Sequence, residues 1–245
     1  MNQNTIIPKR FHVLSNSALK VIAVVTMVID HIGVVFLSKT NIALLSTAGY
    51  TLTLYELSRD IGRLSFPLFA FLLAEGFMRT RDRKKYGWRL FAFALISEIP
   101  WNLEHRGTIF FPESQNVFFT LLLGYLAMCA IYQAEQEQGK KRIMYLLAPF
   151  ALLTLSFFSC ADYGFYGVGF ILMLWLLRKH PVCRAVVGVC MLPSRWIGGL
   201  AFIPMGMYNG KRGFIKGRVL QFAFYAFYPA HMLLFYLIKR ATVGF

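Results

Sequence analysis

The sequence LKVIAVVTMVIDHIGVVFL occupies residues Leu19–Leu37. It is apolar almost throughout, and about 20 helical residues are enough to cross the ~30 Å hydrocarbon core of a bilayer. This stretch therefore predicts a transmembrane helix. Asp30 and His31 lie within it, and it lacks the small-residue cleavage site of a secretory signal, so we do not expect it to be removed.

The composition of the whole chain supports the same interpretation. Of its 245 residues, 57% are hydrophobic and 15% are charged, with a mean hydropathy of +0.54. An ordinary soluble domain has about 45–50% apolar and about 25% charged residues. These values exclude a water-soluble enzyme and a disordered chain. The four cysteines form no CxxC pair and lie in or beside apolar stretches, so we expect buried apolar side chains, with no metal or redox site.

The net charge of +15 is distributed in a pattern typical of a multi-pass membrane protein. Lys and Arg cluster in alternate gaps between the apolar stretches, most densely in residues 79–89, while the other gaps carry acids such as Glu56 and Glu113. The positive-inside rule predicts that the N-terminus and each basic gap face the cytoplasm. Anionic lipid then accounts for the charge, and we expect no nucleic-acid partner.

The chain is predicted to be an all-α bundle of about nine transmembrane helices in a single domain, residues 1–245, with eight or ten spans as alternatives. The segment Ser38–Arg59 is expected outside, with an interfacial helix at about Ile42–Leu57. The predicted spans are Leu19–Leu37, Ile61–Met78, Trp88–Asn102, Asn116–Gln133, Ile143–Cys160, Tyr163–Leu177, two short helices within Cys183–Tyr208, and Val219–Ile238.

Several ionisable side chains fall inside predicted spans, where each is energetically costly and is a functional candidate. At ~1.5 Å per residue, Asp30 and Glu98 lie about 15 Å from the cytoplasmic boundary, and His231 and Arg63 lie about 20 Å or more from it. Four different helices thus carry ionisable groups at middle to outer depth. We expect these groups to meet in one enclosed site within the bundle.

Helical spacing places further polar groups near these four. Asn102 lies one turn after Glu98, and Tyr228 lies three residues before His231, beside a proline that bends the helix. Polar side chains at the starts of the fourth and sixth spans complete the set: Asn116, Tyr163 and Tyr166.

Each candidate also has a purely structural interpretation. Asp30 and Arg63 are explained equally well as a buried ion pair that fixes the helix register. Either histidine is explained by a hydrogen bond to a backbone carbonyl, and Glu98 by contact with water at a helix end. The basic residues 79–89 determine the topology first, and phosphate binding there is a secondary hypothesis.

Six motifs, taken in order, resemble one family. They are VTMVIDHIG at Val25–Gly33, IGRLSFPLFAFLLAEGF at Ile61–Phe77, ISEIPWN at Ile96–Asn102, NVFFTLLLG at Asn116–Gly124, YGFYGVGFILML at Tyr163–Leu174 and FYAFYPAHMLLFYLI at Phe224–Ile238. Over most of the chain they are similar to the TraX family, whose name-giving member is associated with acetylation of conjugative pilin. The resemblance implies a multi-pass acetyltransferase of the bacterial cytoplasmic (inner) membrane that uses acetyl-CoA. It leaves the acceptor open between a membrane protein and an envelope polymer.

The roles of the residues follow from chemistry and are not carried over from the family. Acyl transfer needs a base for the proton of the acceptor, a cation or donor for the developing oxyanion, and a dry site. His31 or His231 is the candidate base, and Asp30 is a candidate to orient one of them. Arg63 would stabilise negative charge, and Glu98 is a further catalytic candidate. The substrate-binding candidates are Asn102, Asn116, Tyr163, Tyr166 and Tyr228, and the candidates for the phosphates of acetyl-CoA are Arg81, Arg83, Lys84 and Lys85. No permanently bound cofactor or metal is expected.

Two other classes of function fit the same residues. A proton-coupled secondary transporter also places Asp, Glu and His near the middle of the bilayer, and the sequence Pro193, Ser194 and Arg195 predicts a broken helix of the kind found in transporters. The lack of a visible inverted repeat argues against it. A non-catalytic membrane assembly protein is the third interpretation, in which the polar groups only specify packing.

Overall fold

The computed structural model describes residues 7–38, 40, 42–47, 50–192 and 196–243, and these are mainly helical. Five helical stretches are long and apolar enough to cross a membrane: Asn16–Leu37, Leu54–Arg79, Val117–Ala134, Gly139–Phe158 and Arg218–Thr242. The prediction of an all-α, polytopic membrane protein is confirmed. The count of nine spans and the cytoplasmic N-terminus stay predictions.

The chain divides into two compact units. The first unit comprises Met1–Phe69 and Pro181–Phe245, and the second comprises Ala70–His180. Helix α3, Ser65–Arg79, begins in the first unit and ends in the second. The single domain expected from the sequence stays a prediction.

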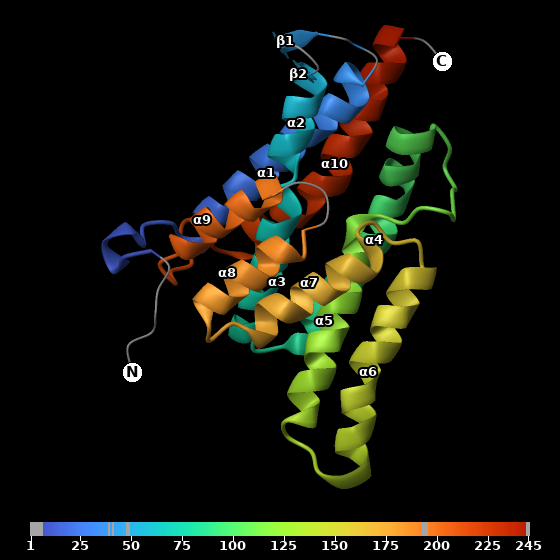
Figure 1. Cartoon of the computed structure of the whole chain (residues 1–245). Coiled ribbons are helices and arrows are strands. Elements are labelled where there is room, and N and C mark those ends of the chain that lie inside the picture. The colour runs from blue at the N-terminus through green and yellow to red at the C-terminus, as the bar shows by residue number, and fades with distance from the viewer. Residues whose placement is uncertain (1–6, 39, 41, 48–49, 193–195, 244–245) are drawn as a thin grey trace. The chain divides into compact units, whose positions relative to one another are not determined.

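Three long helical elements form the centre of the first unit. Helix α1, Asn16–Ile32, continues into a π-helical turn, η2, at Gly33–Leu37. It packs against α2, Leu54–Gly62, and against α10, Arg218–Val243, as Figure 1 shows. Both ends of the sequence thus contribute helices to one layer.

Two glycines allow α1 and α2 to approach closely. A β-carbon on Gly33 would overlap the side chain of Ser58, and one on Gly62 would overlap the carboxyl of Asp30. Small residues at helix contacts are typical of membrane proteins, where close backbone packing stabilises the association of helices. The position of Asp30 therefore depends on the missing side chain of Gly62.

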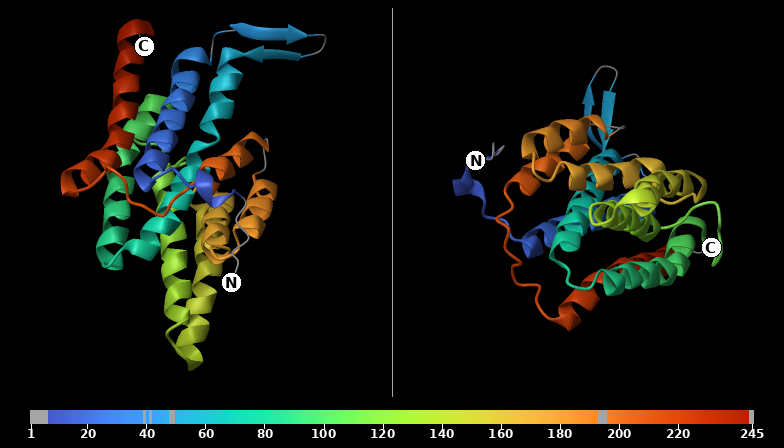
Figure 2. Two further views of the ribbon diagram at one scale, coloured as in Figure 1. Left: turned by 90° about the vertical axis from the view of Figure 1, so that its left-hand side faces the viewer. Right: turned by 90° about the horizontal axis from the view of Figure 1, so that it is seen from below.

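The segment between the first two spans is a β-hairpin followed by a helix, so the interfacial helix predicted at Ile42–Leu57 is wrong for its first part. Strand β1, Ala43–Thr47, pairs antiparallel with β2, Tyr50–Thr53, and the hairpin extends from the start of α2 (Figure 2). The β-branched threonines of this segment favour strands. Helix α2 begins only at Leu54, because Thr53 and Glu56 form a capping box with N···O distances of 2.9 and 3.2 Å.

The region Cys183–Tyr208 consists of short helical pieces, as expected. They are α8 at Pro181–Cys190, the 3₁₀ helix η3 at Trp196–Ala201 and α9 at Phe202–Gly206. The break expected at residues 193–195 lies outside the described residues.

The second unit is a four-helix arrangement centred on α5. Helix α5, Val117–Ala134, contacts α4, Arg83–Arg106, α6, Gly139–Phe158, and α7, Gly164–Leu176. Helices α5 and α6 form an antiparallel pair, visible in Figure 1. The four helices lie where the third to sixth spans were predicted, and α5 and α6 are among the five stretches that are long and apolar enough to cross a membrane. Helix α4 is longer than predicted because Asp82 caps its start, where Oδ1 accepts from the Lys85 N–H at 2.9 Å, and Gly107 ends it in the left-handed conformation.

The prediction that the cysteines are buried is wrong for three of them. Cys160, Cys183 and Cys190 are exposed and Cys129 is half-buried, and all four are free thiols. In a soluble protein an apolar neighbourhood indicates the core, but a membrane helix is also apolar on the side that faces lipid. Apolar neighbours in the sequence therefore do not locate a cysteine here.

The contact between Gly33 and Ser58 can be tested with a double-mutant cycle. Gly33→Ala is expected to lower the free energy of unfolding by about 1–3 kcal/mol, because the added methyl group overlaps Ser58. Adding Ser58→Gly removes that overlap. The double variant should therefore lose about 1 kcal/mol less stability than the sum of the two single losses, measured by thermal unfolding of the detergent-solubilised protein. Strictly additive losses would show that the two positions do not touch.

The free cysteines report the predicted topology. The predicted orientation places Cys160 outside and Cys183 on the cytoplasmic side, and both thiols are exposed. In variants that retain only one of them, a membrane-impermeant maleimide should label Cys160 in intact spheroplasts and Cys183 only after permeabilisation. The reverse pattern would invert the topology, and equal labelling would contradict the span count.

Candidate functional site

Two histidines from distant parts of the sequence meet in the first unit. His31 lies on α1 and His231 on α10, their ring centroids are 5.0 Å apart and the rings are nearly perpendicular at 88°. Both side chains are buried. Among the residues predicted to be catalytic, His31 and His231 are two whose side chains contact each other directly, ring to ring.

The hydrogen bonding of His231 defines the state of its ring. Nδ1 lies 3.0 Å from the backbone carbonyl oxygen of Phe227. A carbonyl only accepts, so Nδ1 carries the hydrogen, and in the neutral ring the lone pair is on Nε2. The Phe227 ring also stacks on the imidazole, with centroids 5.2 Å apart and 10° between the planes. The ring is therefore held in the tautomer and orientation in which Nε2 acts as a base.

Asp30 forms an ion pair, but its partner is Arg59. Nη1 of Arg59 lies 2.7 Å from Oδ1 of Asp30, and both side chains are half-buried. Arg63, the partner considered from the sequence, has its Nε 3.6 Å from Oδ1 of Asp60 on its own helix. The end of α2 thus supplies two arginines and one acid beside α1.

Tyr228 joins the histidine pair from the same turn of α10. Its ring centroid lies 5.7 Å from that of His231, and the side chain is buried. Pro229 lies within the helix at this point. The first unit thus brings together Asp30, His31, Tyr228 and His231, with Arg63 on the adjacent end of α2.

A second polar group lies in the second unit and is centred on Glu98. Its Oε2 accepts from Nδ2 of Asn116 at 2.6 Å, and its Oε1 accepts from Nδ2 of Asn102 at 3.3 Å. Both asparagines are fully buried, and Asn116 also caps α5 by accepting from the Phe118 N–H at 3.1 Å. Glu98 and Asn102 of α4 therefore meet Asn116 at the start of α5.

Tyr163 and Tyr166 lie at the start of α7 with largely exposed rings, 46% and 64%. The described contacts do not join them to Asn116. The start of α5 is linked instead to residues 160–162, since the Thr120 hydroxyl donates to the backbone carbonyl of Asp162. Their role as substrate-binding residues stays a prediction.

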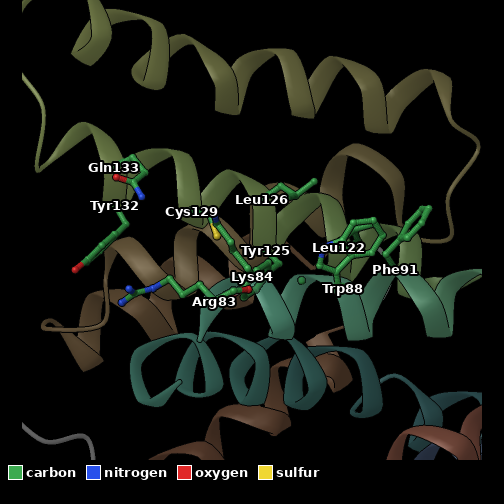
Figure 3. A pocket seen from close by; sticks show the side chains of 11 residues that line it. Arg83, Lys84, Trp88, Phe91, Leu122, Tyr125, Leu126, Cys129, Tyr132 and Gln133 are labelled. Carbon is green, nitrogen blue, oxygen red and sulfur yellow. The ribbon is translucent and has the colours of Figure 1, made fainter. Parts of the chain in front are cut away.

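The basic residues between α3 and α4 have different environments. Nζ of Lys85 lies 3.3 Å from Asp82, whose carboxyl has a lowered pKa because the Lys85 backbone N–H donates to it. Arg81 is exposed. Arg83 and Lys84 instead line a cavity of about 510 Å³ between α4 and α5 (Figure 3). The four residues predicted to hold phosphates therefore divide into two that line the cavity, Arg83 and Lys84, and two that do not, Arg81 and Lys85.

The predicted residues thus form two groups, one in each unit. Asp30, Arg63 and His231 belong to the first unit and Glu98 to the second. Their meeting in one chamber stays a prediction. Among the described residues, no cluster of His, Cys, Asp and Glu has the composition of a metal site.

Comparison with protein families gives a match over residues 15–239, to the family described as TraX protein. This chain belongs to the TraX family. The match covers both units and includes every residue of the two polar groups.

One curated relative of this TraX protein carries a functional name. The chain is 32% identical over 244 residues to a probable fimbrial assembly protein FimC, serogroup H1, from Dichelobacter nodosus, covering 88% of this chain and 92% of the relative. No solved structure matches.

Arg59 and Asp60 are the site residues of this TraX protein that the sequence analysis missed. Both precede the predicted second span, and Arg59 is the last residue of the segment expected outside. Their spacing in the sequence could have indicated this site, because Arg59 and Arg63 are one helical turn apart and Gly62 lies between them. A helix that starts at Leu54 carries all three onto the end facing α1.

The Asp30–Arg59 pair should be worth more than an exposed ion pair. Arg59→Gln is expected to destabilise the protein by about 1–3 kcal/mol, between the values for exposed and fully buried pairs, because it leaves the Asp30 carboxylate without its partner. Adding Asp30→Asn removes the uncompensated charge and should restore part of the loss in thermal unfolding. A double variant as unstable as the sum of the singles would contradict the pairing.

Proposed function

We propose that this TraX protein is a membrane-embedded acyltransferase. It would move an acetyl group from acetyl-CoA to an amine or hydroxyl of an acceptor at the bacterial cytoplasmic membrane. The observation that supports this most directly is the buried His31–His231 pair, in which Nδ1 of His231 is committed to the Phe227 carbonyl and Nε2 is the basic atom of the neutral ring.

The proposed reaction uses the histidine pair as its base. The acceptor nitrogen or oxygen attacks the thioester carbonyl carbon, and Nε2 of His231, or the ring of His31, takes the proton that the acceptor loses. The carbon–sulfur bond then breaks, and the thiolate of coenzyme A leaves with the electron pair and takes the proton back from the imidazolium, which restores the neutral histidine. General base catalysis of this kind contributes about 10²–10⁴-fold to a rate.

The other candidates have supporting roles in this proposal. Arg63 and the Tyr228 hydroxyl would stabilise the oxyanion, and the carboxylate of Asp30 would stabilise the imidazolium through its charge. Glu98 with Asn102 and Asn116, and the tyrosines Tyr163 and Tyr166, remain the proposed substrate-positioning groups. The basic segment 79–89 would hold the phosphates of the donor at the cytoplasmic face.

The acceptor is proposed from the relative's name. Since that protein is named for fimbrial assembly, we propose that a pilus or fimbrial subunit held in the membrane is the acceptor, ahead of an envelope polymer. The same name supports the second candidate function, a non-catalytic assembly protein, in which the polar groups only specify packing.

Acetyl transfer from labelled acetyl-CoA by the purified protein tests the proposal. His231→Ala is expected to reduce the rate by about 10²-fold or more, because the base is lost. His31→Ala and Arg63→Ala should reduce it as well. His180→Ala is the matched control, since His180 is exposed at the end of the second unit, and it should keep the wild-type rate.

Different outcomes separate the competing functions. Full activity in all three site variants would place the reaction elsewhere. Loss of thermal stability in these variants, with no acetyl transfer by the wild type, would favour the assembly protein. Flux of a solute into vesicles without consumption of the thioester would favour a transporter.

A further inference from the structure

The cavity between α4 and α5 in the second unit has a polar end and an apolar end. Figure 3 shows Arg83, Tyr132 and Gln133 at one end, and Phe91, Trp88 and Leu122 at the other. No acidic side chain is among the residues that line it. The cavity therefore offers two cationic groups beside an apolar surface.

The cations at the polar end have no anionic partner among the described residues. Arg83 and Lys84 form no ion pair there, whereas their neighbour Lys85 is paired with Asp82 and Arg79 with Glu75. The Arg83 guanidinium lies over the Tyr132 ring, 4.0 Å from its centroid, and its backbone carbonyl accepts from the Tyr125 hydroxyl at 2.9 Å. Arg83 is thus held in place by aromatic contacts, which leave its charge available for an anion.

The apolar end is exposed at the side of the unit. Trp88 is 68% exposed, and Phe91 and Leu126 are also exposed. At ~1.5 Å per residue, the groove runs about 10 Å along α4 from Lys84 to Phe91 and about 16 Å along α5 from Gln133 to Leu122. One leaflet of the hydrocarbon core is about 15 Å deep, half of the ~30 Å total. The whole groove, from its polar end to its apolar end, is therefore about as long as one leaflet is deep along α5 and shorter along α4.

We propose that this groove binds an anionic phospholipid of the cytoplasmic leaflet. Its phosphate would lie at Arg83 and Lys84, and an acyl chain would lie along Trp88, Phe91 and Leu126. The charge complementarity favours an anionic lipid over a zwitterionic one, because two cations line the groove without an acid. Coenzyme A would use the cations but not an apolar wall that faces the bilayer.

This inference narrows the donor site of the proposed acyl transfer and does not depend on the rest of that proposal. It assigns Arg83 and Lys84 to lipid, and it leaves the exposed Arg81 and Lys85 for the phosphates of the donor. The two proposals fail separately, because one is measured by retained lipid and the other by transferred acetyl groups.

Adjacent lysines provide a matched test. Wild-type protein would be released from nanodiscs of phosphatidylglycerol or phosphatidylcholine, and the lipid bound per protein counted by native mass spectrometry. We expect retention of phosphatidylglycerol over phosphatidylcholine. Lys84→Gln should reduce that retention about fivefold, since a basic residue near an anionic lipid contributes about 1 kcal/mol. Lys85→Gln removes the same charge one residue away, from a side chain that does not line the groove, and should retain wild-type levels.

A second variant tests the apolar end without changing the charge. Leu126→Trp fills the groove at an exposed position, so the protein should fold and bind less phosphatidylglycerol. Equal losses in Lys84→Gln and Lys85→Gln would overturn the proposal in favour of general attraction by the basic segment. Displacement of the lipid by coenzyme A at concentrations that support acetyl transfer would also overturn it and assign the groove to the donor.

Discussion

A polar side chain inside a bilayer needs a partner within the protein, because the hydrocarbon core offers none. This constraint explains the contacts at the centre of both units. Asp30 is paired with Arg59, Glu98 accepts from two asparagines, and His231 donates to a carbonyl of its own helix. The contacts of Asp30 with Arg59 and of Glu98 with Asn116 also fix how neighbouring helices are placed, since a charged or amide group can be satisfied only at a defined distance.

Close helix packing is the condition for these contacts. The carboxyl of Asp30 occupies the space that a side chain at position 62 would fill, so the ion pair with Arg59 exists because residue 62 is glycine. In the second unit, the first residue before α5 is Asn116, and its amide both caps the helix and reaches Glu98. One residue therefore ends a loop, starts a helix and satisfies a carboxylate.

The helices of this TraX protein are predictable from the sequence because apolar length and the clustering of basic residues are strong one-dimensional signals. That polar groups from several helices would meet was expected from the cost of an ionisable side chain at membrane depth, whereas the particular contacts of His31 with His231 and of Glu98 with Asn116 were not predicted, and the single enclosed site stays a prediction. The sequence did not predict that Asp30 pairs with Arg59 and not with Arg63. That partner depends on where α2 begins, and a β-hairpin stands where a helix was expected before α2. The exposure of Cys160 was equally inaccessible, because the apolar residues around it are typical of both the core and the lipid-facing side.

The contacts of Asp30 also define how it can influence the histidines. Its described hydrogen bond goes to Arg59, and the orientation of the His231 ring comes from the Phe227 carbonyl. Asp30 therefore does not orient His231 through a direct hydrogen bond, as a carboxylate does in a catalytic triad. Its remaining influence is electrostatic, because its carboxylate carries a negative charge one residue away from His31 in the sequence. The two perpendicular imidazoles therefore have different surroundings. Nδ1 of His231 is bonded to the backbone, whereas His31 follows the carboxylate of Asp30 in the sequence. This asymmetry distinguishes the two rings chemically, with Nε2 of His231 defined as the acceptor atom by a contact within its own helix.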